Sequence, residues 1–266
     1  VELCFHTPHL WAFSWEKRWF RHHLYRLAEK FAGTMTNEIL AVSDAQYEQA
    51  TRAHILPESR IHVLKNAVEP PPEGIKHSPP SDKWTLGTAA RLMPQKGVDT
   101  LIRAFAEFHV KVADSRLLIA GDGPLEEDLK AIAARLGVGD CVEFKGHVED
   151  IYGFFSSLHV FAMPSRWEGY PYTLLEAMSA GVPVIATDIP GISEALFHEF
   201  NGLLCEPDNE RSLLKSLERA HEDPRMMNSL AANARDMVAC DGPGEFCRKL
   251  EYRYIRAKEN FAGFHG

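Results

Sequence analysis

Residues 159–187 of the 266-residue chain read "HVFAMPSRWEGYPYTLLEAMSAGVPVIAT", and this stretch predicts the repeating unit of the fold. A short apolar strand, "HVFAMPS", is followed by a helical pattern over 172–180 and then by a second apolar strand, "VPVIAT". Two apolar strands separated by a helix indicate a βαβ crossover, in which both strands are parallel and buried on both faces. The stretch therefore predicts an α/β protein with a doubly wound parallel sheet.

The same alternation continues in both directions from this stretch. From residue 83 to the end of the chain, we predict further strands at "WTLGTAA", "RLLIAG", "CVEFKG" and "NGLLCEP", and helices at 97–110, 124–136, 149–157, 191–198, 208–222, 225–238 and 244–258. Upstream, strands are predicted at "ELCFH", "NEILAVS" and "RIHVLKN", and helices at 14–31 and 44–54.

A proline-rich stretch, "NAVEPPPEGIKHSPPSDKW", separates these two parts of the chain. Its prolines cannot continue a helix or a central strand, so it is typical of a semi-rigid linker. We predict part of an N-terminal Rossmann-like domain over 1–67, a linker over 68–82, and a complete C-terminal Rossmann-like doubly wound domain over 83–266. Because Val1 opens inside a strand pattern, we expect the N-terminal part to be trimmed.

Composition excludes several classes of protein. A formal net charge of -8 argues against a general nucleic-acid binder, which needs a basic surface to displace phosphate counterions. The 5 cysteines are scattered and contain no CxxC pair, so neither a disulfide framework nor a thiolate zinc site is predicted. No apolar run approaches the roughly 18 residues that a membrane span needs. We therefore predict a cytoplasmic protein.

Ligands of doubly wound sheets bind beyond the carboxyl ends of the strands, and the first candidate site residues lie there. In "AARLMPQKG", Arg91 and Lys96 flank a loop that follows a predicted strand, and Gly97 permits a tight backbone before the next helix. A planar guanidinium fork together with a mobile ammonium suits two neighbouring phosphate groups. The alternative is that both side chains are ordinary solvated surface residues.

A second loop at a predicted strand end, "IAGDGPLEEDL", has Gly121 and Gly123 around Asp122. Pro124 suits the first turn of a helix. A lone Gly-x-Gly is a weak signal, and a plain strand-to-helix turn explains it more simply than a ligand contact. The two interpretations are compatible.

The third loop is the one inside the opening stretch. Pro171 ends a turn, and a helix that begins near Tyr172 leaves the amides of Tyr172, Thr173 and Leu174 as an anion site. Glu176 lies on the first turns of that helix and Glu168 in the loop before it. Either acid alone is explained as a helix cap or a solvated glutamate, but a carboxylate also accepts hydrogen bonds from sugar hydroxyls. A nucleotide sugar, which carries both phosphates and hydroxyls, would satisfy all these groups together.

These motifs resemble those of a known family, the retaining glycosyltransferases of the group 1 type (family 4), which have the two-domain GT-B fold. The resemblance runs over most of the chain. It is carried by "VSDAQYE", "VLKNAVE", "AARLMPQKGVDTLIRAF", "LLIAGDGPLEEDL", "VEFKGHVEDIYGFF", "FAMPSRWEGYPYTLLEAMSAGVPVIATDIPGISEAL" and "NGLLCEPDN". The E-x7-E element with its downstream "AMSAGVPVIAT" is its most specific part.

The resemblance implies a role for each candidate residue in binding the donor. Arg91 and Lys96 would hold the donor diphosphate with help from the amides of residues 172–174, and Glu176 would accept hydrogen bonds from the nucleotide ribose. The backbone at His147 and Val148 would contact the base. Residues 83–266 would then be the nucleotide-sugar-binding domain, and the UDP- or GDP-linked sugar is a substrate, with no cofactor expected.

The resemblance also implies catalytic roles. Glu168 would contact the donor sugar near the reacting centre as a positioning and charge-stabilising group. In "CFHTPH", His6, or alternatively His9, would reach the donor sugar. Without the family, a His-x2-His pair at a strand end is more often structural or accidental than a metal site. No metal is expected, because cationic side chains and amides already serve the diphosphate and no DxD motif is present.

The predicted helix 14–31 admits two interpretations. Its apolar stripe, which recurs at the helical period, consists of Phe20, Leu24, Leu27, Ala28 and Phe31. We expect this stripe to be core. The helix also carries tryptophans and basic residues, namely Trp15, Trp19, Lys17, Arg18, Arg21 and Arg26. The alternative is therefore peripheral contact with an anionic membrane, at its inner, cytoplasmic face.

The function expected from the resemblance is transfer of a sugar, with retention, from a nucleotide-diphosphate sugar to a hydroxyl of a saccharide or lipid-linked acceptor. This would serve polysaccharide, lipopolysaccharide or glycolipid synthesis. Two alternatives stay open: a GT-B nucleotide-sugar epimerase, and a truncated nucleotide-binding subunit without activity of its own.

Overall fold

The computed structural model describes residues 3–16, 18–75, 77–80 and 82–262. Within these residues the chain forms two compact units. The first unit takes in the chain up to Ala67, the short segment Glu168–Pro171 and the chain from Asp241 onward; the second comprises Val68–Trp167 and Tyr172–Cys240. Both units are therefore discontinuous in sequence. The domain boundaries expected at 67/68 and 82/83 stay a prediction.

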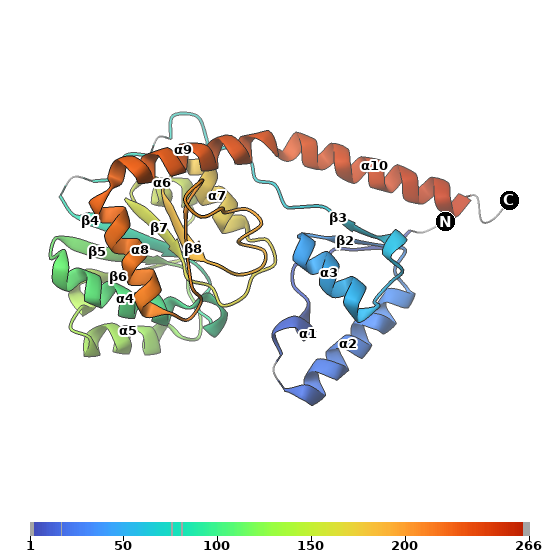
Figure 1. Cartoon of the computed structure of the whole chain (residues 1–266), viewed down its shortest axis with the longest axis horizontal. Helices are drawn as coiled ribbons and strands as arrows, with labels where there is room; N and C mark the ends of the chain where they lie inside the picture. The colour runs from blue at the N-terminus through green and yellow to red at the C-terminus, as the bar shows by residue number, and fades with distance from the viewer. Residues whose placement is uncertain (1–2, 17, 76, 81, 263–266) are drawn as a thin grey trace. The chain divides into compact units, whose positions relative to one another are not determined.

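A parallel sheet of six strands forms the centre of the second unit (Figure 1). Its strands are β4 (Trp84–Ala89), β5 (Ser115–Ala120), β6 (Val142–Gly146), β7 (Val160–Met163), β8 (Val184–Thr187) and β9 (Leu203–Cys205). Their order is β6-β5-β4-β7-β8-β9, and each neighbouring pair is parallel. Since β4 lies between β5 and β7, the chain winds outward in both directions from it. The predicted α/β class with a doubly wound sheet is confirmed.

The helices of the second unit alternate with its strands, except that β9 follows β8 with no helix described between them. They are α4 (Val98–Lys111), α5 (Glu126–Arg135), α6 (Ile151–Ser156), α7 (Tyr172–Ala180), α8 (Glu210–Glu222) and α9 (Pro224–Cys240). The apolar face of α4 is fully buried through Leu101, Phe105 and Phe108, in one core with Leu86 of β4 and Leu117 of β5. Burial of these side chains from both sides explains why the strands read as continuous apolar runs.

The helix expected at 191–198 does not form, and that prediction is wrong. Gly191 has a positive φ of 87°, and the next residues make turns instead. Their hydrogen bonds mix two spacings, since the amides of both Ile192 and Ser193 donate to the carbonyl of Ile189. A run of only a few residues after Pro-Gly cannot settle into a regular helical ladder.

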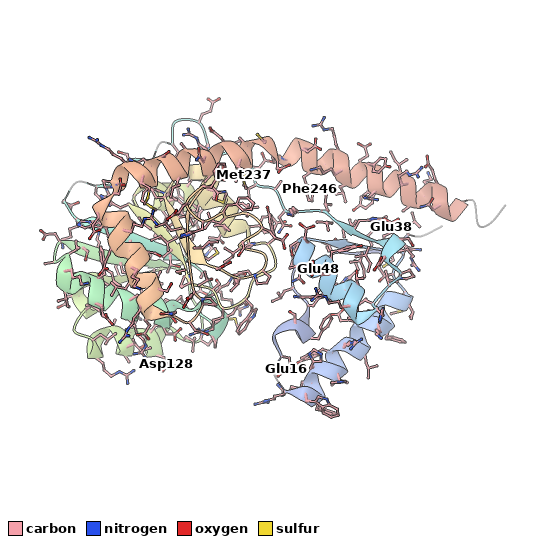
Figure 2. All side chains as sticks on the ribbon, viewed as in Figure 1. Glu16, Glu38, Glu48, Asp128, Met237 and Phe246 are labelled. Atoms are coloured by element: carbon pink, nitrogen blue, oxygen red, sulfur yellow. The ribbon has the colours of Figure 1, made fainter. Side chains whose placement is uncertain are left out.

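The first unit contains a smaller parallel sheet, of order β1-β2-β3, made by β1 (Phe5–His6), β2 (Glu38–Ala41) and β3 (Ile61–Val63). Its helices are α1 (Ala12–Trp15), α2 (Trp19–Thr34), α3 (Asp44–Ala53) and α10 (Pro243–Ala262). Ser43 caps α3 by accepting a hydrogen bond from the Gln46 amide at 3.1 Å. Ile39, Ile61 and Trp11 form the core. Glu38, labelled in Figure 2, opens β2 and is only 6% exposed.

The apolar stripe on α2 is not core, so that expectation is wrong. The predicted helix 14–31 is interrupted before Trp19, where Arg18 is extended and donates its amide to the Glu16 carboxylate at 2.8 Å. The stripe residues are largely exposed: Phe20 70%, Leu24 51%, Leu27 64% and Phe31 69%. The opposite face of α2 packs inward instead, because Arg26 donates hydrogen bonds to the Ala53 carbonyl and the His22 ring contacts the Phe13 carbonyl.

Candidate active site

A cavity of about 350 Å³ opens at the carboxyl ends of β4, β5 and β6 in the second unit. Its lining residues are Ala89, Ala90, Arg91, Ala120, Gly121, Asp122, His147, Val148, Ile151, Thr173 and Glu176. The sheet order reverses beside β4, and this is where doubly wound sheets bind ligands. Five residues predicted for donor binding, Arg91, His147, Val148, Thr173 and Glu176, therefore meet in one cavity.

Two glycines allow the strand-end loops to approach each other at this cavity. Gly121 has a φ of 113°, and its amide donates to the Gly146 carbonyl at 2.6 Å. A Cβ at this position would lie only 2.1 Å from the Ala90 carbonyl oxygen, so a side chain would not fit. A Cβ at Gly123 would lie 2.5 Å from the Leu92 carbonyl. The Gly-x-Gly motif is thus a tight turn, as expected, and its first residues also line the cavity.

Three charged side chains line the cavity, namely Arg91, Asp122 and Glu176, and the surroundings of Arg91 and Glu176 differ. Arg91 is exposed at the end of β4, and its guanidinium has no hydrogen-bond or ion-pair partner among the residues that the structure describes. Glu176 lies on the second turn of α7, where burial raises the pKa of its carboxyl group above the usual range. The cavity therefore presents a cation that is available to an anionic ligand and a shielded hydrogen-bond acceptor.

The amino end of α7 provides a further anion-binding feature. The helix begins at Tyr172, directly after Pro171, and Thr173 lines the cavity. Leu174 is 0% exposed, so its side chain belongs to the core and only its amide could face a ligand. Free amides and the positive end of the helix dipole favour an anion at this position. Tyr172 and Leu174 are not among the described residues that line the cavity.

Lys96 and Gly97 lie on a neighbouring loop rather than in the lining of this cavity. Lys96 ends the 3-10 turn η2 (Pro94–Lys96), and Gly97 follows with a φ of 63°. A Cβ on Gly97 would lie 2.1 Å from the Pro164 carbonyl, so only glycine fits here. This close approach brings the Lys96 loop against the segment that leads to Glu168.

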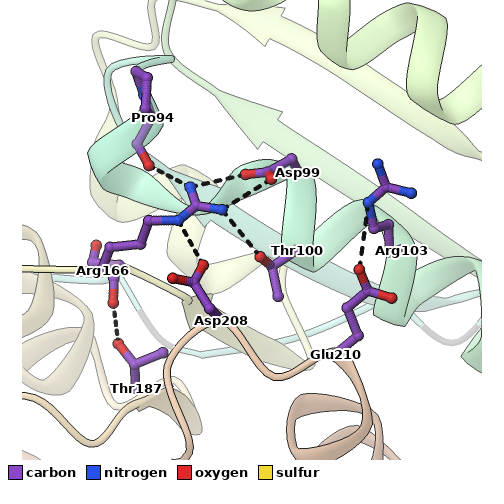
Figure 3. A network of polar contacts seen from close by, with 9 residues as sticks. Pro94, Asp99, Thr100, Arg103, Arg166, Thr187, Asp208 and Glu210 are labelled. Atoms are coloured by element: carbon purple, nitrogen blue, oxygen red, sulfur yellow. Dashed lines mark hydrogen bonds and ion pairs between the residues drawn. The ribbon is translucent and has the colours of Figure 1, made fainter.

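Arg166 organises that segment, and sequence reasoning missed it (Figure 3). Its guanidinium forms a bidentate pair with Asp99 at 2.9 and 3.0 Å and donates to Asp208 at 2.6 Å and to the Pro94 carbonyl. Gln95 adds two bonds to this network: its carbonyl accepts from the Arg166 amide at 2.8 Å, and its side chain donates to the Trp167 carbonyl at 2.8 Å. No local pattern could have revealed it, since Asp99 and Asp208 are distant in sequence.

The three residues predicted for catalysis all belong to the first unit. Glu168 is only 8% exposed. The next residue, Gly169, packs so closely on the backbone of His9 that a Cβ would lie 1.7 Å from the His9 carbonyl oxygen. His6 ends β1, and its Nε2 lies 3.8 Å from a carboxylate oxygen of Glu29 on α2. The structure thus brings His9 against the Glu168–Pro171 segment and directs His6 toward α2.

Metal binding and membrane spanning each require a recognisable group of residues. No group of three or more histidine, cysteine, aspartate or glutamate side chains there could hold a metal ion. No described helix is both long and apolar enough to span a bilayer. The expectation that no metal is needed stays a prediction.

The chain belongs to the family described as glycosyl transferases group 1, whose family model matches residues 73–237. The match covers the whole cavity and the Arg166 network. An uncharacterised glycosyltransferase of Haemophilus influenzae is 31% identical over 210 residues, which are 79% of this chain and 52% of that protein. The galactosyltransferase of Escherichia coli that is named for UDP-Gal and α-D-GlcNAc-diphosphoundecaprenol is 28% identical over 256 residues, covering 90% of this chain and 65% of that protein. The chain thus spans about half to two thirds of these relatives.

A solved structure establishes the fold class. HepE of Anabaena, determined with UDP and glucose, superposes with a TM-score of 0.84 at 20% identity over 96% of this chain and 72% of that chain. The parallel α/β sheets of this chain match that structure over almost their whole length, so the GT-B fold expected from the resemblance is confirmed. The similarity at this identity concerns the fold alone.

Proposed function

We propose that this chain provides the donor-binding part of a glycosyltransferase that moves a sugar from a UDP- or GDP-linked donor to an acceptor hydroxyl. One observation carries the proposal: the cavity at the switch point of the sheet combines an exposed arginine, a half-buried glutamate and a helix amino end. A nucleoside diphosphate offers a matching group for each, namely phosphate for Arg91 and the α7 amides, and ribose hydroxyls for Glu176. Membership of the group 1 family supports it.

Each predicted donor residue has a place in this proposal. The base lies against the backbone at His147 and Val148, and the diphosphate lies between Arg91, Lys96 and the amides of residues 172–174. Gly97 holds the Lys96 loop in position. These cations and amides act on the charge that develops on the departing diphosphate, so the reaction is expected to proceed without a bound metal.

We further propose that Glu168 and a histidine, His6 or His9, contact the donor sugar. Glu168 would position the sugar and stabilise positive charge at its anomeric carbon. A single displacement at the anomeric carbon would invert its configuration. We nevertheless propose that the configuration is retained, and the resemblance of the motifs is the only ground for this. The test is the anomeric configuration of the product, determined by NMR on the first turnover; an inverted product would contradict retention.

The acceptor is proposed to be a saccharide or a lipid-linked saccharide in polysaccharide, lipopolysaccharide or glycolipid synthesis. Names of relatives support this range, because they include the galactosyltransferase of Escherichia coli above and lipopolysaccharide core glycosyltransferases of Rhizobium meliloti. An epimerase and an inactive subunit remain the alternatives, and the comparisons do not favour them. Labelled donor consumed without any acceptor, with formation of its epimer, would identify an epimerase.

The exposed face of α2 supports a proposal of peripheral contact with an anionic membrane, on the cytoplasmic side. Phe20, Leu24, Leu27 and Phe31 form an apolar ridge, and Arg18 and Arg21 lie at the amino end of the helix. Such a helix lies in the headgroup region, where anionic lipids attract the basic side chains. Leu27→Ser should reduce cosedimentation with vesicles containing phosphatidylglycerol, and equal cosedimentation of wild type and variant would contradict the contact.

A binding screen tests the donor proposal. We expect calorimetry with UDP, GDP and ADP to show one-to-one binding of at least one of them, with a preference among the bases. No binding of any of the three would contradict the assignment of the cavity. Binding without transfer to any acceptor tried would favour the inactive-subunit alternative.

A further inference from the structure

The chain enters the second unit through a proline-rich segment that is held to α6 by a few polar contacts. We call residues 69–75 and 77–78 the strap; it begins two residues after Ala67, the last residue of the preceding stretch of the first unit. Pro70, Pro71 and Pro72 stiffen its first part. The strap contains no helix or strand, so side-chain and backbone contacts outside it must hold it in place.

Three hydrogen bonds attach the strap to α6 and the turn after it. The Tyr152 hydroxyl donates to the Glu69 carbonyl at 2.7 Å, and the Ser78 amide donates to the Ser156 carbonyl at 3.1 Å. The His77 Nε2 lies 2.7 Å from the Leu158 carbonyl. Because a carbonyl can only accept, that nitrogen carries the proton. Burial lowers the pKa of His77, which favours the neutral ring that this bond requires.

Packing under the strap is incomplete, so these polar contacts carry much of its attachment. A cavity of about 420 Å³ lies between Pro71, Ile75 and His77 of the strap and the facing residues of α7 and α9. The facing residues include Ser179 at the carboxyl end of α7 and Asn228 and Arg235 on α9. A segment that spans a cavity gains little from apolar burial, and loss of one hydrogen bond should loosen it measurably.

Tyr152 also lies beside residues that line the nucleotide cavity. Its neighbour Ile151 lines that cavity. Ser179 lies near the Tyr152 hydroxyl and lowers its pKa, whereas burial and, to a smaller extent, the nearby carboxylate of Glu176 raise it. Glu176 and Ser179 are one turn apart on α7, so both face the same side of that helix. Tyr152 therefore connects a cavity-lining acid to the first residue of the strap.

We propose that Tyr152 is a positioning residue that makes the attachment of the strap depend on nucleotide in the cavity. This rests on the proposed function, in which Glu176 accepts hydrogen bonds from the ribose. A ligand that fixes the Glu176 side chain and closes the cavity beside Ile151 fixes the surroundings of the Tyr152 hydroxyl. The Tyr152 to Glu69 bond then persists for longer, and the strap opens less often.

Amide hydrogen exchange of the whole chain tests this, read by mass spectrometry on peptides that cover residues 69–78. In the wild type, saturating UDP, or GDP or ADP if calorimetry shows that it binds better, should slow exchange of the strap at least threefold. Tyr152→Phe should exchange two- to tenfold faster than wild type without nucleotide, as expected for loss of one hydrogen bond. It should also lose the nucleotide-dependent slowing while its nucleotide affinity stays within about threefold of wild type.

Tyr252→Phe is the matched control, because Tyr252 is exposed on α10 in the first unit. Tyr252→Phe should match wild type both in the exchange rate of the strap without nucleotide and in the slowing of that exchange by nucleotide. Nucleotide-dependent slowing that persists in Tyr152→Phe, or an unchanged strap in wild type with nucleotide bound, would overturn the coupling and leave the donor site intact. If calorimetry finds no nucleotide bound at all, the proposed function and the coupling fall together.

Discussion

Two arginines at the carboxyl edge of the same sheet have opposite surroundings. Arg166 is only 21% exposed at its side chain and is paired with Asp99 and Asp208. Arg91 is exposed in the cavity and has no partner within the described part of the chain. A guanidinium neutralised by two acids holds a loop in place, whereas one without a partner can bind a ligand. Arg166 therefore supports the structure around the site, whereas Arg91 is part of the site itself.

The largest expected effect follows from removing the paired arginine. Arg166→Ala leaves Asp99 without its bidentate partner and frees the loop that precedes Glu168, so it should lower the free energy of unfolding by about 3 kcal/mol. Thermal and urea unfolding would measure it. Asp208→Ala, which removes the more exposed of the two partners, should cost less than half as much. Equal stability of Arg166→Ala and wild type would show that the network contributes nothing.

Glu168 directly follows the loop that Arg166 holds in place, and its substitution should affect the turnover number rather than the affinity for nucleotide. Glu168→Gln keeps the shape of the side chain but removes its charge, so the turnover number should fall about a hundredfold if the carboxylate stabilises a developing positive charge. Nucleotide affinity should change less than threefold. A parallel loss of turnover and affinity would make Glu168 a binding residue instead.

A third experiment concerns the half-buried carboxylate of Glu176, which, unlike that of Asp99, lines the cavity. Burial raises the pKa of Glu176, so its carboxylate takes up a proton at a higher pH than an ordinary glutamate. If the ribose hydroxyls donate to that carboxylate, nucleotide affinity should fall as the pH is lowered through this raised pKa. Glu176→Gln should bind about three- to tenfold more weakly at neutral pH and lose this pH dependence. Titrating both proteins with the same nucleotide cancels the ligand's own ionisation, and identical pH profiles would refute the role.

The smallest expected effect concerns a buried carboxylate outside the cavity. Burial raises the pKa of Glu38, although Arg253 and Arg60 oppose the shift. The folded state therefore binds this proton more tightly than the unfolded state, and the stability that it contributes is lost as the pH rises through the folded pKa. Glu38→Gln should be more stable than wild type at neutral pH by at most about 1 kcal/mol. The difference should vanish below the ordinary glutamate pKa, and a constant difference at all pH values would point to packing.

Most of the second unit could be predicted because its signals are local. Apolar runs separated by helical patterns marked β4 to β9, and the carboxyl ends of those strands indicated where Arg91, Thr173 and Glu176 would meet. The α2 stripe was misjudged because the helical period shows only that one face of a helix is apolar. It does not show whether another element packs on that face. Arg166 was missed since its partners are distant in sequence, with Asp99 on the first turn of α4 and Asp208 in a loop. The turn at 189–196 was misjudged since Pro-Gly weakens a short helix.

Calorimetric titration of Arg91→Ala against Arg103→Ala tests the central claim most directly. Arg103 is a matched control, because it lies on α4 and its Nε is 3.4 Å from Glu210, outside the cavity (Figure 3). We expect the preferred nucleoside diphosphate to bind Arg91→Ala at least tenfold more weakly than wild type, since charge-assisted bonds contribute about 1.5–3 kcal/mol. Arg103→Ala should bind as wild type. Equal affinity of all three proteins would contradict the assignment of the cavity as the diphosphate site.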